Sequence, residues 1–283
     1  MPQRPVPTVR QRRLGAELRK MREHAGMNVA QAAERLGADR TRISNMESGR
    51  LGVSGERVRM LAAIYSCGDR PYVDALAAMA AERGRGWWDD YRERMAVDAL
   101  DLAELDSHAV SLRAVQIMHI PGLLQTEDYA NAVFSTAEPA LTSAQRRVNV
   151  SYRMRRREVL DRDDPPQCIF LIHEAALRME FGGAKVTRGQ LERLLEASEW
   201  DNVTVRAIPF SAGGFPNAGA SVTYMHGVVP QLDTVQLDAP TGVTFLDGEA
   251  HLANYRRVLD RTEALTLAPA DTRDFIQAIA QRL

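Results

Sequence analysis

The chain has 283 residues, an apolar fraction of 45% and a formal net charge of −1, a size that suggests two domains with enough apolar material for a core. No apolar run approaches the roughly 18 residues that span a bilayer, and the N-terminal stretch MPQRPVPTVRQRR lacks the apolar segment of a signal peptide. The only cysteines, Cys67 and Cys168, have no partner at metal-ligand spacing, which argues against disulfides and structural zinc and fits a cytoplasmic protein away from membranes.

The charge is divided unevenly along the chain. Residues 1–60 carry 13 Arg or Lys against 6 Asp or Glu, a balance of +7, so the remainder carries −8. A basic N-terminal part before an acidic body indicates that this part meets a polyanion. The alternative is a solvated basic tail, because four arginines precede any periodic segment: Arg4, Arg10, Arg12 and Arg13.

The first predicted helix covers residues 10–24. Leu14, Leu18 and Met21 recur there at helical spacing between charged residues. Gly26 ends this helix. A later helix is indicated by the apolar stripe of Val58, Leu61 and Ile64.

Two short helices lie between them. Asn28 can cap a helix over 29–36, which Gly37 ends because a residue with positive φ is favoured there. Asp39 can cap the next helix, 40–48. A helix, a glycine-containing turn and a second helix at this spacing are typical of a helix-turn-helix domain.

The helix over 40–48 has the pattern of a DNA-recognition helix. Ile43 and Met46 are its predicted buried pair. The side chains predicted to point outward are Arg40, Thr41, Arg42, Ser44 and Asn45. These residue types form hydrogen bonds with base edges and phosphates. The alternative is a small helical bundle with a polar outer face.

The run GMNVAQAAERLGADRTRISNMESGR, residues 26–50, resembles the Xre-type family of phage-repressor-like regulators. The resemblance implies a mainly helical, λ-repressor-like domain, which we place at residues 1–70. It also implies an internal ion pair between Arg22 and Glu47, which we assign to structure. Val29 is a departure, because the family usually has Gln at this position.

The same resemblance implies the DNA contacts. The residues expected to contact bases are Arg40, Thr41, Arg42 and Asn45. Asn28 matches a phosphate-contacting cap of the family, and residue type and the geometry of the domain add Ser44 and Arg50 as expected phosphate contacts. The helix would enter a major groove while Arg50 and the basic arm before Leu14 follow the backbone. One such domain covers a half-site, so we expect a homodimer on double-stranded DNA.

The remaining chain predicts an α+β domain with a small mixed or antiparallel sheet. We place a helical linker at 71–110 and an effector or partner-binding domain at 111–283. The predicted helices are 72–83, 88–100, 126–135, 143–160, 174–181, 187–199, 249–264 and 270–282. The predicted strands are 111–120, 168–173, 203–208, 220–226, 234–237 and 243–246.

Three segments resemble catalytic motifs, but none is complete. The stretch 173–177 begins like a zinc-binding HExxH helix, yet Leu177 replaces the second histidine. The stretch 182–187 lacks the spacing of a phosphate-binding loop and reads as a helix-ending turn. The loop 211–214 has no His and Asp pattern around its serine. We therefore predict no catalytic residue, no cofactor and no metal.

Two further clusters leave alternatives open. Trp87 and Trp88 are expected to pack at a domain junction, with a ligand platform as the alternative. The basic cluster consists of Arg153, Arg155, Arg156 and Arg157. We interpret it as a solvated helix face, with an anion site or a second DNA contact as the alternatives.

The body resembles the uncharacterised C-terminal domain of actinobacterial WhiJ-like regulators, some of which are described as antitoxin-like. The resemblance is carried by IPGLLQTEDYANAVF (120–134), HEAALRMEFGG (173–183), QLERLLE (190–196), NVTVRAIPFSAG (202–213) and LAPADTRDFI (267–276). It implies a body that works with a small companion protein encoded nearby. A departure is Gln236-Leu237-Asp238, where the family often has an aromatic and acidic pair.

These observations give three hypotheses. The first is a DNA-binding transcription regulator whose body senses a small partner protein or a ligand. The second is an antitoxin-like protein that neutralises a small partner and regulates its own operon. The third is an enzyme targeted by the N-terminal domain, which the absence of a complete catalytic motif disfavours.

Overall fold

The structure, a computed structural model, describes residues 6–82, 84–239 and 242–283. The chain forms two compact units. Unit 1 comprises Met1–Gly86 together with Val228–Leu232, and unit 2 comprises Trp87–Gly227 and Asp233–Leu283. Within the described ranges, no helix combines the length and apolar character needed to traverse a bilayer.

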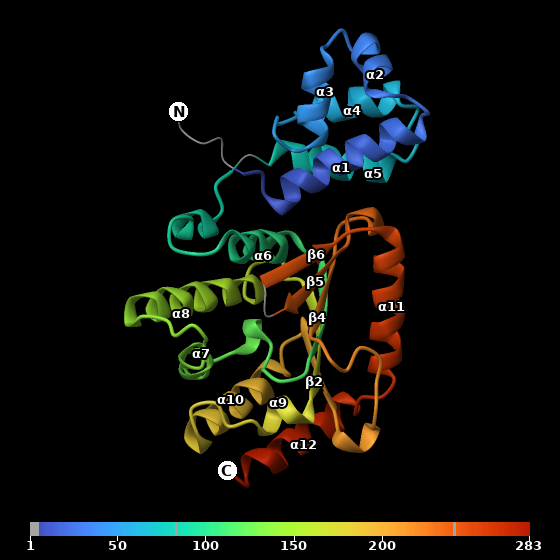
Figure 1. Cartoon of the computed structure of the whole chain (residues 1–283). Helices are drawn as coiled ribbons and strands as arrows, with labels where there is room; N and C mark the ends of the chain where they lie inside the picture. Colours follow the sequence, from blue (N-terminus) through green and yellow to red (C-terminus); the bar gives the residue numbers. More distant parts are fainter. Residues whose placement is uncertain (1–5, 83, 240–241) are drawn as a thin grey trace. The chain divides into compact units, whose positions relative to one another are not determined.

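Unit 1 is helical (Figure 1). Its helices are α1 (Val9–His24), α2 (Val29–Arg35), α3 (Arg40–Glu47), α4 (Gly55–Ile64) and α5 (Arg70–Ala81). Each begins with a side chain that accepts a hydrogen bond from a backbone N–H of the first turn. These N-cap residues are Thr8, Asn28, Asp39, Ser54 and Asp69. Such caps satisfy donors that a helix start leaves unpaired and so fix where each helix begins.

One apolar core joins these helices, and Leu18, Ile43, Leu61 and Leu76 are among its buried members. Helix α5 belongs to this core, so unit 1 extends past the boundary expected at residue 70. A polar contact also joins α5 to α1, since the Tyr72 hydroxyl donates a hydrogen bond to the buried Glu17 carboxylate at 2.6 Å.

Unit 2 is α+β. Its helices are α6 (Val97–His108), α7 (Glu127–Ser135), α8 (Ser143–Arg157), α9 (Glu174–Arg178), α10 (Ala184–Ala197), α11 (Glu249–Glu263) and α12 (Pro269–Ala280). Its strands are β1 (Ser111–Gln116), β2 (Gln167–His173), β3 (Val203–Ile208), β4 (Val222–His226), β5 (Thr234–Ala239) and β6 (Gly242–Leu246). The predicted fold class, a helical domain followed by an α+β domain with a mixed sheet, is confirmed.

The six strands form one sheet in the order β3-β2-β1-β4-β5-β6. β1, β2 and β3 run parallel, whereas β4, β5 and β6 join antiparallel. Helix α11 covers one face, and the other helices of unit 2 lie on the opposite side (Figure 1). Each face therefore has its own apolar layer, which explains why β2 is buried along most of its length.

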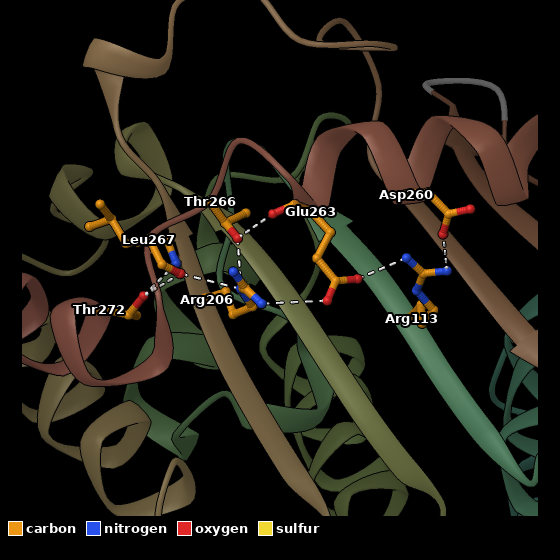
Figure 2. Close-up of polar contacts among 8 residues, drawn as sticks. Arg113, Arg206, Asp260, Glu263, Thr266, Leu267 and Thr272 are labelled. Atoms are coloured by element: carbon orange, nitrogen blue, oxygen red, sulfur yellow. Dashed lines mark hydrogen bonds and ion pairs between the residues drawn. The ribbon is translucent and has the colours of Figure 1, made fainter.

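A chain of polar contacts attaches α11 and the following loop to the sheet (Figure 2). Glu263 pairs with Arg113 of β1 at 2.8 Å and with Arg206 of β3 at 3.6 Å. The outer edge of β3 is closed by this loop and by the start of α12, because Leu267 N–H donates to the Ala207 carbonyl and Ala207 N–H donates to Thr272 Oγ1 of α12. The edge strand is thereby protected from pairing with another chain.

The sequence prediction was wrong at residues 88–100. Instead of one helix, a 3₁₀ turn spans Trp87–Tyr91 and α6 begins at Val97. In a 3₁₀ turn, residues three apart lie on the same side, and Trp88 and Tyr91 both join the aromatic cluster of unit 2 with Trp87 and Tyr152. Packing of these rings overrides the helical pattern.

Several element ends also differ from the prediction. The first strand ends at Gln116, α9 ends at Arg178, and α10 begins at Ala184. Gly182 and Gly183 both have positive φ and form the turn that leads into α10. The glycine pair therefore starts a helix, whereas the sequence reading had it ending one.

Candidate nucleic-acid interface

Helix α3 is held in place by the apolar core on its inner face and by a cap at its N-terminus. Ile43 and Met46 are 1% and 4% exposed and belong to the core of unit 1. The Asp39 carboxylate accepts a hydrogen bond from the Arg42 N–H at 2.7 Å. Gly37 has a φ of 56°, as predicted for the turn between α2 and α3. The orientation of α3 therefore does not depend on its outer side chains.

The outer face of α3 is polar and open. Arg40, Thr41, Arg42 and Ser44 are exposed, and Asn45 is half-buried beside them. Among the described residues, none of these side chains makes a hydrogen bond or ion pair with the protein. Their donors and acceptors remain available to a partner, and their types suit base edges in a major groove.

Of the predicted phosphate contacts, Ser44 lies within α3, whereas Asn28 and Arg50 lie beside helix ends. Asn28 is exposed and caps α2, since its Oδ1 accepts from the Gln31 N–H at 3.0 Å. In return the Asn28 N–H donates to Gln31 Oε1 at 2.8 Å. The capping box occupies the side-chain oxygen and the backbone N–H of Asn28, and it leaves the side-chain NH₂ group for a phosphate. Arg50 is exposed directly after Gly49.

Arg22 and Glu47 form the predicted internal ion pair. Arg22 Nε and Nη2 donate to the two Glu47 carboxylate oxygens at 2.6 and 2.9 Å, and Nη1 donates to the Met27 carbonyl at 2.7 Å. The hydrogen bonds to Glu47 raise the pKa of Arg22. This prediction is confirmed, and the pair ties α1 to the last turn of α3.

Two glycines let α1 lie directly against α3 and the turn that follows it. A Cβ on Gly15 would stand 2.6 Å from the Glu47 carbonyl oxygen and 2.7 Å from that of Met46. A Cβ on Gly49, where φ is +73°, would stand 2.7 Å from the Gln11 carbonyl oxygen. Since real Cβ atoms do not approach backbone so closely, both positions require glycine.

The basic arm before Leu14 differs from the prediction. Arg13 is 5% exposed and pairs with Glu17 at 3.0 Å, and Arg10 pairs with Glu82. Arg12 donates to the Pro7 carbonyl, and Arg4 lies outside the described residues. Arg13 is therefore not a backbone-tracking residue. The spacing of Arg13 and Glu17, four residues apart on a helix, was the available signal.

The basic cluster on α8 is not a solvated face, so that interpretation was wrong. Arg156 is 15% exposed and pairs with the buried Asp106 at 2.6 Å. Arg153 is half-buried and donates to Gln125 Oε1 at 2.6 Å. Arg155 alone is clearly at the surface. The cause is register, because residues 153 and 156 share the inward face of α8.

The incomplete motifs have structural roles. His173 is the N-cap of α9, where its Nδ1 accepts from the Ala175 N–H at 3.2 Å. Glu174 pairs with Arg178 at 2.6 Å and accepts from the Phe210 N–H at 2.7 Å. Across the described ranges, no group of three His, Cys, Asp or Glu side chains is arranged to hold a metal ion.

Comparison with protein families gives two matches. Residues 13–76 match a helix-turn-helix domain, and residues 99–278 match a domain described as "Domain of unknown function (DUF5753)". Searches among curated proteins and among solved structures gave no match.

Proposed function

Since the chain belongs to the DUF5753 family and carries a helix-turn-helix domain ahead of that domain, we propose that it is a sequence-specific DNA-binding transcription regulator. Its body responds to a small partner protein or a ligand. It acts as a homodimer, because one helix-turn-helix domain reads a single half-site.

The observation that carries the proposal is the outer face of α3. Exposed arginine and threonine side chains and the half-buried Asn45 have no protein partner there in the described ranges, while Ile43 and Met46 hold the helix from inside. Arg40, Thr41, Arg42 and Asn45 contact bases, and Asn28, Ser44 and Arg50 contact phosphates. Arginine pairs with guanine and asparagine with adenine through two hydrogen bonds each.

The test is a mobility-shift titration with the DNA upstream of the protein's own gene. Arg40→Ala and Asn45→Ala should each weaken binding by about 1–3 kcal/mol. Arg59→Ala is the control, because Arg59 is an exposed arginine of α4 that pairs with the exposed Asp74, and affinity should stay near that of the wild type. Full affinity of the Arg40 and Asn45 variants would refute the assignment of α3.

The phosphate contacts are tested by salt dependence. Arg50→Ala should weaken binding to all sequences alike and reduce the slope of log affinity against log salt by about one. An unchanged slope would remove Arg50 from the interface. A small protein that co-purifies with the chain would support the companion-protein form of the body's role.

A further inference from the structure

Unit 2 contains a cavity of about 410 Å³ between the sheet and helices α6, α7 and α8. Its floor is a row of side chains in register across three strands, with Ala114 of β1, Thr223 of β4 and Gln236 of β5. The small side chains at the centre of this row leave the space open. The volume lies within the range of small-molecule sites, about 300–1,000 Å³.

Arg153 of α8 lines this cavity in a fixed position. Its guanidinium donates to Gln125 Oε1 and lies 4.2 Å from the centre of the Phe134 ring. Gln125 is 2% exposed, and its Nε2 donates to the Ile120 carbonyl at 2.8 Å. That second bond turns Oε1 toward the arginine, so the segment 120–125 positions the guanidinium.

Among the described residues Arg153 forms no ion pair, and Asp238 is the carboxylate whose charge acts on it from a distance. Its neighbour Arg156 is already matched by the buried Asp106. Burial, followed by the charge of Arg156, lowers the pKa of Arg153 to about 10, so Arg153 still carries its charge at neutral pH. A charge that is largely desolvated and forms no ion pair is costly, and an arriving anion would relieve that cost.

Two carboxylates line the same cavity. Asp98 accepts from the backbone N–H groups of Ala99 and Val243, and Asp238 accepts from Gln236 Nε2 at 2.6 Å. In the described part of the chain, neither makes an ion pair, although Asp238 is near enough to raise the pKa of Arg153. The cavity is therefore lined by the Arg153 guanidinium and two carboxylates that form no ion pair with one another.

We infer that this cavity binds a free amino acid, with the ligand carboxylate on Arg153 and its ammonium group toward Asp238 and Asp98. A zwitterion satisfies both signs of charge, whereas a dianion would be repelled by the two aspartates. Apolar side chains such as Leu102 and Phe170 offer contacts to a ligand side chain. That the amino acid is the effector of the regulator rests on the proposed function. That the cavity binds an amino acid does not depend on the proposed function.

The test uses the full-length protein and each of the twenty amino acids, by thermal shift and then by calorimetric titration. At least one free amino acid should bind, and its N-acetyl and carboxamide forms should bind at least about tenfold weaker, since each lacks one charge. Inorganic phosphate is the anion control. Absence of binding by all twenty, or equal binding of the N-acetyl form or of phosphate, would overturn the inference.

Matched variants locate the site. Arg153→Gln and Asp238→Asn should each weaken binding at least about tenfold. Arg155→Gln, on the same helix but exposed and outside the cavity lining, should bind as the wild type does. If Arg153→Gln does not fold, Asp238→Asn carries the test. Wild-type affinity in Asp238→Asn would overturn the inference.

A parallel mobility shift separates this inference from the proposed function. Arg40→Ala should lose DNA affinity and keep amino-acid binding. Amino-acid binding without any DNA binding by the wild type would overturn the regulator and leave the site in place. DNA binding that the bound amino acid does not alter would overturn only its role as effector.

Discussion

At the scale of single residues, burial decides what a charge does. Arg19 and Arg22 lie three positions apart on α1, and each pairs with a glutamate. The Arg19–Glu23 side chains are 63% and 50% exposed, whereas those of Arg22 and Glu47 are 6% and 9% exposed. An exposed pair is solvated and contributes little, while removal of one partner from a buried pair leaves an uncompensated charge.

Glu47→Gln is therefore expected to lower the free energy of unfolding by about 3–5 kcal/mol, because it removes the carboxylate that accepts two hydrogen bonds from Arg22 and leaves only the longer contact with the exposed Glu23, at 3.6 Å. Glu23→Gln is the matched control and should cost less than about 1 kcal/mol. Urea unfolding followed by circular dichroism measures both. Similar losses for the two variants would show that burial does not distinguish these pairs.

Titration of the His173 side chain makes the free energy of unfolding depend on pH. Burial lowers its pKa below the usual value, and the neighbouring Glu174 opposes that shift. Because the folded pKa is below the unfolded one, the contribution of the neutral imidazole is complete above the unfolded value, about 6.5. It is lost as the pH falls through the folded pKa.

His173→Asn retains an N-cap residue but cannot be protonated. We expect it to reduce the loss of unfolding free energy between neutral pH and pH 5. Unfolding titrations at a series of pH values measure this. The same acid dependence in variant and wild type would exclude His173 as a source.

At the scale of elements, α11 is attached to the sheet by side chains as well as by its apolar face. Glu263 lies between Arg113 and Arg206, which come from strands on either side of β2 (Figure 2). Asp260 also pairs with Arg113, but its side chain is 66% exposed and that of Glu263 is 26% exposed. The two carboxylates of one helix should thus contribute unequally.

Glu263→Gln should lower the stability of unit 2 by about 1.5–3 kcal/mol, the value of hydrogen bonds to charged groups. Asp260→Asn should cost less than about 1 kcal/mol because water already solvates that carboxylate. Denaturant unfolding of each variant tests the comparison. An equal or larger loss in Asp260→Asn would contradict it.

The sequence pattern was enough to locate most helices and strands, but not to decide which face of each helix points into the core. Asp39, Gly37 and the Ile43–Met46 pair fixed α3, because capping and periodicity are local. Local patterns could not show that Arg153 and Arg156 point inward, since the pairing of Arg156 with Asp106 joins residues 50 apart in the chain. The polar cavity was missed for the same reason, as its lining comes from separate elements.

At the scale of the whole molecule, the two units have separate apolar cores. The core of unit 1 contains Leu18 and Ile43, and those of unit 2 contain Phe170 and Leu259. Multidomain chains of this kind depart from two-state unfolding. A single midpoint would therefore not describe the stability of the protein.

Calorimetry should resolve two transitions. Glu47→Gln should shift one of them and Glu263→Gln the other, because each variant weakens a different unit. A single transition that both variants shift equally would show that the units unfold together.

The contact at Gly15 extends the proposed DNA interface to a residue outside the outer face of α3. Any side chain there would collide with the backbone at the end of α3, so the helix would have to lift away from α1 and carry its arginines with it. A library randomised at position 15 and selected for operator occupancy should return glycine alone, even though the same library at Arg59 should return nearly every amino acid.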